Sequence, residues 1–164
     1  MSDYTGSVEL RKVVPDDLEI LYRIQTDPKA NDLAKVYARE QSDFYAHWAK
    51  ILESPEVIMR AIAYDGQTVG NINSFPIEGK TYVGYWIERA FWGKGIATRA
   101  VQMLLKIDTT RPMYAIVATK NIGSCLVLEK NGFVKIGESD SPGTDRFAPC
   151  REAHYRLSSI EKPS

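Results

Sequence analysis

Residues 85–98 carry the pattern with the clearest chemical potential in this chain. They read YWIERAFWGKGIAT, with strand-favouring residues first and the start of an amphipathic helix last. A glycine turn between a strand and a helix exposes several backbone N–H groups beside the positive end of the helix dipole. Because glycine has no Cβ, a ligand can approach this backbone closely. The pattern therefore predicts a binding site for a phosphate or a pyrophosphate.

The glycine spacing narrows the choice of phosphate compound. A Walker-type loop places Ser or Thr directly after Gly-Lys, whereas here Gly95 follows Lys94. The dinucleotide fingerprint needs a third glycine at the position where this chain has Thr98. A P-loop NTPase and a dinucleotide-dependent oxidoreductase are therefore disfavoured. Taken alone, the turn fits a plain strand-to-helix connection equally well.

The residues around the turn are more specific. Residues 92–98 resemble the acetyl-CoA pyrophosphate loop of the GNAT N-acetyltransferases, written Q/R-x-x-G-x-G/A, with Trp92 in the Q/R place, Gly95 and Ala97. Residues 121–133, NIGSCLVLEKNGF, are similar to the N-x-x-S…E-K-x-G-F segment of the same family. The resemblance is closest to the branch that includes the ribosomal-protein N-terminal acetyltransferases, and it covers nearly the whole chain.

The resemblance implies an enzyme, an acetyl-CoA-dependent N-acetyltransferase that holds its cosubstrate largely through backbone groups. The backbone N–H of Ile87 would serve as the oxyanion donor, and the Lys94 ammonium would remain solvated. Asn121 would either bind the pantetheine arm or act as a helix N-cap, a role that Asn also fills well. The residues expected to contact acetyl-CoA are Ile87, Gly93, Lys94, Gly95, Ile96, Ala97, Thr98, Asn121 and Ser124.

Ser124 is the candidate that would protonate the leaving thiolate. It lies one helical turn after Asn121, on the same face, and the resemblance implies that its hydroxyl approaches the CoA sulfur. Many family members use a tyrosine one turn further along, where this chain has Leu128, so the acid is either Ser124 or no dedicated residue. Direct attack of the amine on the thioester needs no acyl-enzyme, so we interpret Cys125 as a small core residue.

Glu88 is the candidate general base that would accept the amine proton, directly or through a water. It follows Ile87 at the end of the predicted strand. The alternative is a surface carboxylate paired with Arg89. Several aromatic residues could wall an acceptor pocket, but we interpret them as core by default: Tyr37, Trp48, Phe75, Tyr85 and Trp86.

The elements that must position these residues alternate along one expected domain, residues 1–164. Apolar patterning predicts strands at 8–13, 57–64, 67–76, 81–88, 113–118, 133–137 and 150–157. It predicts helices from residue 15 to about 25 and at 43–52, 96–107 and 122–130, with a short helix and a loop within 29–40. Asp65-Gly66 and Glu78-Gly79 indicate tight turns.

The remaining local predictions concern ends and loops. Ser42 is expected to cap the helix at 43–52, and polar residues 139–149 are expected to form a loop. Residues 1–7 and the tail after Ser158 are expected to be loosely held. The fold class is α/β, of the α+β kind, with a mixed central sheet of about seven strands flanked by helices. The resemblance implies the GNAT fold, in which the sheet splays between residues 81–88 and 113–118 to admit the acyl-CoA.

Composition excludes several other classes of protein. The formal net charge is zero and no Lys/Arg block occurs, so we expect no direct nucleic-acid binding. The two cysteines fit a reducing compartment, and the few His and Cys residues show no metal-ligand spacing. No apolar run is long enough to cross a bilayer, so we expect a cytoplasmic protein without membrane association.

The acceptor amine is open at this stage. The resemblance points to a protein N-terminal amine, whereas a polyamine, an amino acid or an antibiotic are alternatives. A non-catalytic acyl-CoA-binding module on the same fold is a further alternative, since a fold does not fix a function. A homodimer is plausible, but nothing in the sequence determines the oligomeric state.

Overall fold

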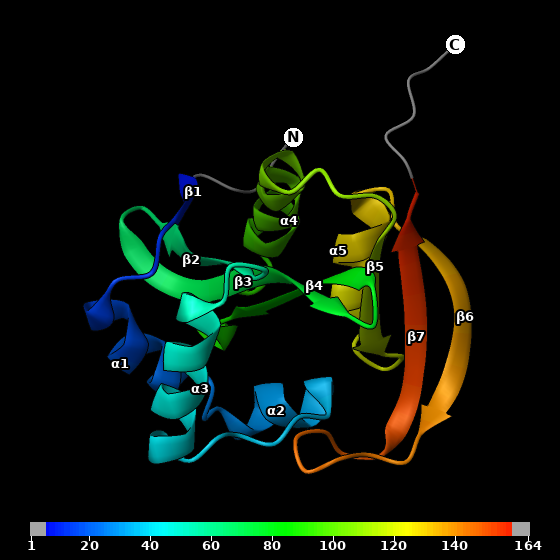
Figure 1. The fold of residues 1–164 in the computed structure, drawn as a ribbon, viewed down its shortest axis with the longest axis horizontal. Helices are drawn as coiled ribbons and strands as arrows, with labels where there is room; N and C mark the ends of the chain where they lie inside the picture. The colour runs from blue at the N-terminus through cyan, green and yellow to red at the C-terminus, as the bar shows by residue number, and fades with distance from the viewer. Residues whose placement is uncertain (1–5, 159–164) are drawn as a thin grey trace.

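The computed structural model describes residues 6–158 of the 164-residue chain (Figure 1). Its elements confirm the predicted order of strands and helices, and several bounds agree to the residue. They are β1 (Val8–Arg11), α1 (Pro15–Ile24), α2 (Pro28–Ala34), α3 (Gln41–Glu53), β2 (Ile58–Tyr64), β3 (Gln67–Ile77), β4 (Lys80–Ile87), the 3₁₀ turn η1 (Arg89–Phe91), α4 (Ile96–Ile107), β5 (Met113–Ala118), α5 (Ile122–Lys130), β6 (Val134–Ser141) and β7 (Cys150–Leu157).

Within residues 6–158, seven strands form one mixed sheet in the order β1-β2-β3-β4-β5-β7-β6. Neighbouring strands are antiparallel except β4 and β5, which run parallel. The hairpins β2–β3 and β3–β4 turn at Asp65-Gly66 and Glu78-Gly79, and all four turn residues have positive φ. That backbone is the one whose twist suits a two-residue hairpin. The predicted meander is confirmed.

The strands β4 and β5 separate soon after they meet. In the described part of the chain their pairing consists of Thr81 with Met113 and Tyr82 with Tyr114, although β4 continues to Ile87. Beyond that point β5 remains paired with β7 on its other side. Figure 1 shows the two strands diverging near the middle of the molecule. The predicted splay is therefore confirmed, and the second half of β4 has an open edge.

Helices cover the sheet on two faces and create two apolar clusters. On one face, α4 and α5 pack residues such as Leu104 against the central strands. On the other face, α1 and α3 pack residues such as Phe44 around Trp86. Since successive strand residues point to opposite faces, Tyr85 joins the first cluster and Trp86 the second. Side chains at the end of β4 therefore pack in both apolar clusters.

Two predictions about element ends are wrong. The loop expected from residue 139 begins later, because β6 continues to Ser141 and pairs with β7 up to Cys150. Most of β6 is exposed at the sheet edge, so its sequence shows no apolar alternation there. Ser42 does not cap α3, since Glu40 holds the N-cap position and the helix has already begun at Gln41.

The chain start is more ordered than predicted at Ser7. Its N–H donates to the Asp65 carboxylate at 2.7 Å, and its carbonyl accepts from the Asp65 N–H at 2.9 Å. These bonds tie the segment before β1 to the β2–β3 turn. The predictions of loose ends otherwise fall on residues 1–5 and 159–164, which lie outside the described residues.

Candidate active site

The glycine turn presents its backbone to solvent, as the sequence predicts. Gly93 and Gly95 both have a φ of 79°, a conformation that favours glycine. Gly95 is the N-cap of α4, so the first N–H groups of the helix have no partner within it. A Cβ built on Gly93 meets no atom within 4 Å, and residues 93–95 are all exposed. The turn is therefore open to a pyrophosphate rather than packed against side chains.

The side chains of this turn divide between solvent and core. Lys94 is exposed, which fits the expectation that its ammonium is solvated. Ile96 is buried in the cluster beneath α4, so only its backbone can contact a ligand. Asn131, at the end of α5, donates to the carbonyls of Thr98 at 3.2 Å and Val127 at 3.0 Å. This amide links the start of α4 to α5 and fixes the turn relative to the second motif.

The register of β4 orients the backbone N–H of Ile87 toward the gap between β4 and β5. Glu88 donates its N–H to Val69 of β3 at 2.8 Å. Because N–H groups alternate sides along an antiparallel strand, the Ile87 N–H points away from β3, toward the open edge. On the same side, the Trp92 indole donates to the Ile87 carbonyl at 2.9 Å. This geometry suits an N–H donor to an acyl oxygen lying in the gap.

Asn121 and Ser124 meet at the start of α5. Asn121 is the N-cap, and its side chain accepts the Ser124 N–H at 3.4 Å, so the capping alternative is realised. The Ser124 hydroxyl lies 2.6 Å from the phenol oxygen of Tyr85, which also donates to the Ser124 carbonyl at 3.2 Å. Burial raises the pKa of Tyr85 to about 12. Tyr85 therefore stays protonated near neutral pH and holds the serine hydroxyl in place.

Glu88 is half-buried at the point where β4 ends. Its predicted alternative partner, Arg89, instead forms an ion pair with Asp27 at 2.7 Å. Among the described residues, no ion pair includes Glu88. Glu88 lines a hollow of about 500 Å³ together with residues of the α1–α2 junction. It is placed where a base could meet an amine that enters from the side of α1 and α2.

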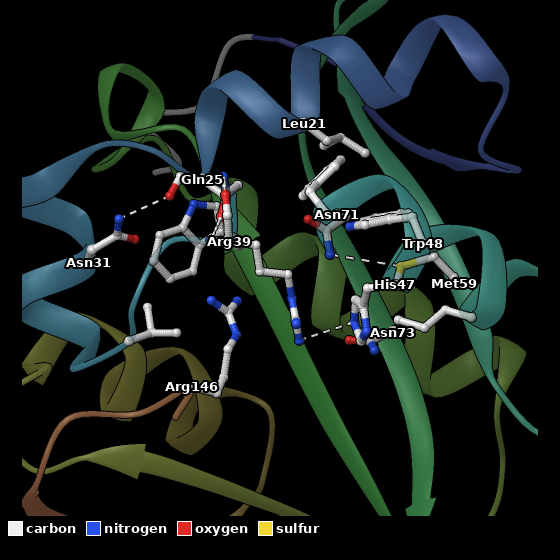
Figure 2. A pocket seen from close by; sticks show the side chains of 14 residues that line it. Leu21, Gln25, Asn31, Arg39, His47, Trp48, Met59, Asn71, Asn73 and Arg146 are labelled. Carbon is white, nitrogen blue, oxygen red and sulfur yellow. Dashed lines mark hydrogen bonds between the residues drawn. The ribbon is translucent and has the colours of Figure 1, made fainter. Parts of the chain in front are cut away.

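A second, smaller pocket lies on the α1 and α3 face beside Trp86 (Figure 2). It draws residues from the helices, from β2, β3 and β4, and from the β6–β7 loop. The two hollows therefore flank the end of β4. Sequence reasoning missed the polar members of the smaller pocket, because they come from separate segments with no common motif.

Tyr85 and Trp92 are the other functional candidates that sequence reasoning undervalued. We interpreted Tyr85 as core, yet its hydroxyl contacts Ser124 of the second motif. The strand alternation that places Tyr85 on the same face as Ile87 was the available signal. Trp92 occupies a motif position usually filled by Gln or Arg, and its indole N–H contacts β4.

Within residues 6–158, no group of three or more His, Cys, Asp or Glu side chains is arranged to hold a metal ion. No helix in that range combines the length and apolarity needed to cross a bilayer. Cys125 and Cys150 are both free thiols.

The described residues combine an open glycine turn at the start of α4 with a parallel strand pair that separates after two residue pairs, which is the arrangement that the GNAT resemblance implies. Comparison with family models agrees, since residues 7–134 match the model described as "Acetyltransferase (GNAT) domain". That match covers more than half of the sequence. The chain therefore belongs to the GNAT acetyltransferases, enzymes that use acetyl-CoA as acyl donor.

Individual relatives agree on the fold. The probable N-acetyltransferase YjcK of Bacillus subtilis (strain 168) is 35% identical over 83 residues, and the match covers 46% of this chain and 46% of that protein. The match thus spans about half the length of that relative. The structure of RimL, the ribosomal L7/L12 alpha-N-protein acetyltransferase, in complex with coenzyme A has a TM-score of 0.76 at 18% identity, with 94% of this chain and 96% of that chain covered.

A third relative has a different kind of substrate. The spermidine N-acetyltransferase from Vibrio cholerae, in complex with CoA and spermine, has a TM-score of 0.78 at 15% identity, with 93% of this chain and 95% of that chain covered. At such identities the likeness establishes the fold alone. A protein acceptor and a polyamine acceptor thus occur among the structural neighbours, and the acceptor must be argued from this chain's own residues.

Proposed function

We propose that the chain transfers the acetyl group of acetyl-CoA directly to a primary amine in a ternary complex. The separation of β4 from β5 after Tyr82, together with the open glycine turn at the start of α4, is the observation that carries this proposal. It supports a cosubstrate whose pyrophosphate lies at the start of α4 and whose thioester reaches the gap. The hollow at Glu88 offers room for the amine near that gap.

Bound acetyl-CoA supplies a thioester carbonyl that an amine can attack. As the carbon–nitrogen bond forms and the carbon–sulfur bond breaks, the amine loses a proton and the sulfur leaves with the electron pair. Glu88 accepts the amine proton, directly or through a water. The Ile87 N–H stabilises the negative carbonyl oxygen. Ser124 passes a proton to the leaving sulfur and takes one back from solvent, and Glu88 releases the amine proton to solvent. No acyl-enzyme is involved.

Two classes of acceptor fit this arrangement. A protein N-terminal amine is favoured by the motif resemblance, and a small amine such as a polyamine, an amino acid or an antibiotic is the alternative. A non-catalytic acyl-CoA-binding module is a separate hypothesis, which keeps the glycine turn and needs no base. The cytoplasmic location and the homodimer remain predictions from the sequence.

A thiol-release screen tests the proposal. Purified protein is incubated with acetyl-CoA and a panel of N-terminal peptides, amino acids and polyamines, while free CoA thiol is measured and the acetylated product is identified by mass. We expect thiol release that requires one class of amine. Tight binding of acetyl-CoA without transfer to any amine would favour the binding module instead.

A further inference from the structure

The smaller pocket beside Trp86 carries positive charge and no described negative charge. Its volume is about 140 Å³, and both Arg39 and Arg146 line it (Figure 2). None of the described residues that line it is Asp or Glu. The other polar members are amides and one histidine. A pocket with this composition offers hydrogen-bond donors to an anion.

Hydrogen bonds fix the main chain of Arg39 and both the main chain and the guanidinium of Arg146 without a ligand. The Arg146 guanidinium donates to the Tyr37 carbonyl, and the Tyr37 N–H donates to the Arg146 carbonyl at 2.8 Å, although these residues lie 109 positions apart. Gln25 accepts the Arg39 N–H at 2.8 Å and donates to the Arg39 carbonyl at 3.1 Å. These hydrogen bonds therefore hold the α2–α3 connection and the β6–β7 loop in place at the edge of the pocket.

Burial and mutual repulsion disfavour the charged forms of the basic groups in the pocket. Burial and the charge of Arg39 lower the pKa of Arg146 to about 10. Burial, and then the charges of Arg39, Arg146 and Lys50, lower the pKa of His47 to about 4. His47 is therefore neutral near pH 7 and adds no third charge. Two half-buried guanidinium groups without a described carboxylate are stabilised when an anion enters.

Two uncharged donors in the pocket are also poorly satisfied. The Trp86 indole N–H is buried and has no hydrogen-bond partner among the described residues. The Asn71 amide donates to the Met59 sulfur at 3.8 Å, and a thioether is a weak acceptor. Buried donors are normally paired, so these groups indicate where a ligand oxygen would gain hydrogen bonds.

The pocket adjoins the proposed reaction centre. Trp86 directly precedes Ile87, the last residue of β4, and Glu88 follows; the Trp86 side chain faces the pocket while Ile87 faces the other cluster. A volume of 140 Å³ is smaller than the roughly 300–1,000 Å³ of sites for whole ligands. It fits one end of an acceptor whose amine extends toward the gap.

We propose that this pocket binds a side-chain carboxylate of the acceptor, so that the favoured acceptor is an acidic amino acid or a peptide with an acidic side chain near its N-terminus, not a polyamine. Guanidinium groups pair with carboxylates through two parallel hydrogen bonds. A polycation would instead place its charges against Arg39 and Arg146. This inference rests on the proposed acetyl transfer and specifies its acceptor.

Paired acceptors test the inference by steady-state kinetics. The pairs are glutamate with glutamine, and the C-terminally amidated peptides Ser-Glu-Ala-Ala with Ser-Gln-Ala-Ala, with spermidine as a polycation. We expect the KM of the acidic member to be about tenfold lower in one of the pairs, which shows whether the carboxylate belongs to a free amino acid or a peptide. Equal KM values within both pairs, or preference for spermidine, would overturn the inference.

Variants connect that preference to the pocket. Arg146→Gln should raise the KM for the acidic acceptor about tenfold and leave the KM for its amide counterpart unchanged. Lys50→Gln is the matched control, because Lys50 is exposed on α3, affects His47 through its charge and does not line the pocket. An equal loss in both variants would mean that general charge, and not contact with Arg146, sets the preference.

A binding measurement separates this inference from the proposed function. The indole N–H resonance of Trp86, assigned with Trp86→Phe, is followed by NMR while glutamate or the acidic peptide is added. We expect a saturable shift that Arg146→Gln abolishes and glutamine does not produce. If no amine is acetylated yet this shift occurs, acetyl transfer fails and the carboxylate site stands. If transfer occurs without any such shift, the carboxylate site fails alone.

Discussion

Glu88 is half-buried and has no ion-pair partner among the described residues. It follows the last residue of β4, whose second half has an unpaired edge. We expect Glu88→Gln to lower the acetyl-transfer rate by about 100-fold, within the range for general base catalysis, because the amide cannot accept a proton. Acetyl-CoA affinity, measured by calorimetry, should remain unchanged. Glu19→Gln, at an exposed position of α1, is the control and should keep the full rate. A wild-type rate for Glu88→Gln across the pH range would remove Glu88 from the mechanism.

Ser124 and Tyr85 share a short contact that positions one hydroxyl. Ser124→Ala should reduce kcat by about 100-fold if this hydroxyl protonates the leaving sulfur. Tyr85→Phe should reduce kcat less, because Ser124 keeps its own proton and loses only its partner. Stopped-flow measurement of thiol release compares the two variants. The reverse order would assign proton donation to the phenol, whose high pKa keeps it protonated.

At the scale of elements, the end of β4 depends on close contact with β3. A Cβ added at Gly70 would lie 2.0 Å from the Trp86 carbonyl oxygen, so one strand would have to move. We expect Gly70→Ala to cost about 1–3 kcal/mol of unfolding free energy, as overpacking usually does. It should also slow transfer, because Trp86 precedes Ile87. Urea unfolding followed by tryptophan fluorescence measures the first effect.

Gly137 provides the matched control for that change. It also lies in a strand without positive φ, and an added Cβ there meets nothing within 4 Å. Gly137→Ala should therefore change stability by less than about 1 kcal/mol. Equal stability losses for Gly70→Ala and Gly137→Ala would show that contact with the Trp86 carbonyl is unimportant.

At the scale of the whole molecule, a buried ionic network joins β1, α1 and β3. Asp17 accepts from Arg11 at 2.7 and 2.8 Å, from the Val14 N–H at 2.8 Å and from Thr68 at 2.8 Å. Burial alone would raise the pKa of Asp17, but these hydrogen bonds outweigh it and hold the pKa below its usual value. The network is therefore a source of pH-dependent stability.

The sign of that dependence follows from the lowered pKa. Above about pH 5 the carboxylate is ionised in both states and the network contributes fully. As the pH falls further, the unfolded chain takes up the proton first and stability is lost. Urea unfolding at pH 7 and pH 3 should show a smaller pH dependence in Asp17→Asn than in wild type. Asp16→Asn, at the exposed neighbouring position, should retain the wild-type dependence. Identical pH dependence in wild type and Asp17→Asn would contradict the prediction.

Most of the fold was accessible from sequence because its strands and helices bury one apolar face each. The bounds of α4 and β5 agree to the residue with the apolar patterning. The errors lie where that signal is absent. Residues 139–141 of β6 are polar at an edge, and their pairing with β7 depends on long-range backbone bonds. The short helix and loop predicted within 29–40 agree with the structure, where Asp27 caps α2 and Gln25 holds Arg39 in the segment that follows.

For the site, too, the features with a local sequence signature were predictable and the long-range contacts were not. The glycine turn was predictable because φ > 0 and solvent-exposed N–H groups leave a local glycine signature. The pocket of Arg39 and Arg146 was not, since the two residues approach only after the β6–β7 loop folds back onto the α2–α3 connection. The Tyr85 contact with Ser124 likewise joins β4 to α5 and has no counterpart in local sequence.

The central claim is that open backbone at the glycine turn binds the pyrophosphate of acetyl-CoA, and a pair of matched variants tests it. Gly93 and Gly66 have φ of 79° and 82°, and an added Cβ meets nothing within 4 Å at either. Valine at both positions should therefore strain the backbone similarly. By isothermal titration calorimetry, Gly93→Val should weaken acetyl-CoA binding by at least about tenfold, whereas Gly66→Val should not. Wild-type affinity in Gly93→Val, or equal weakening in both, would contradict the claim.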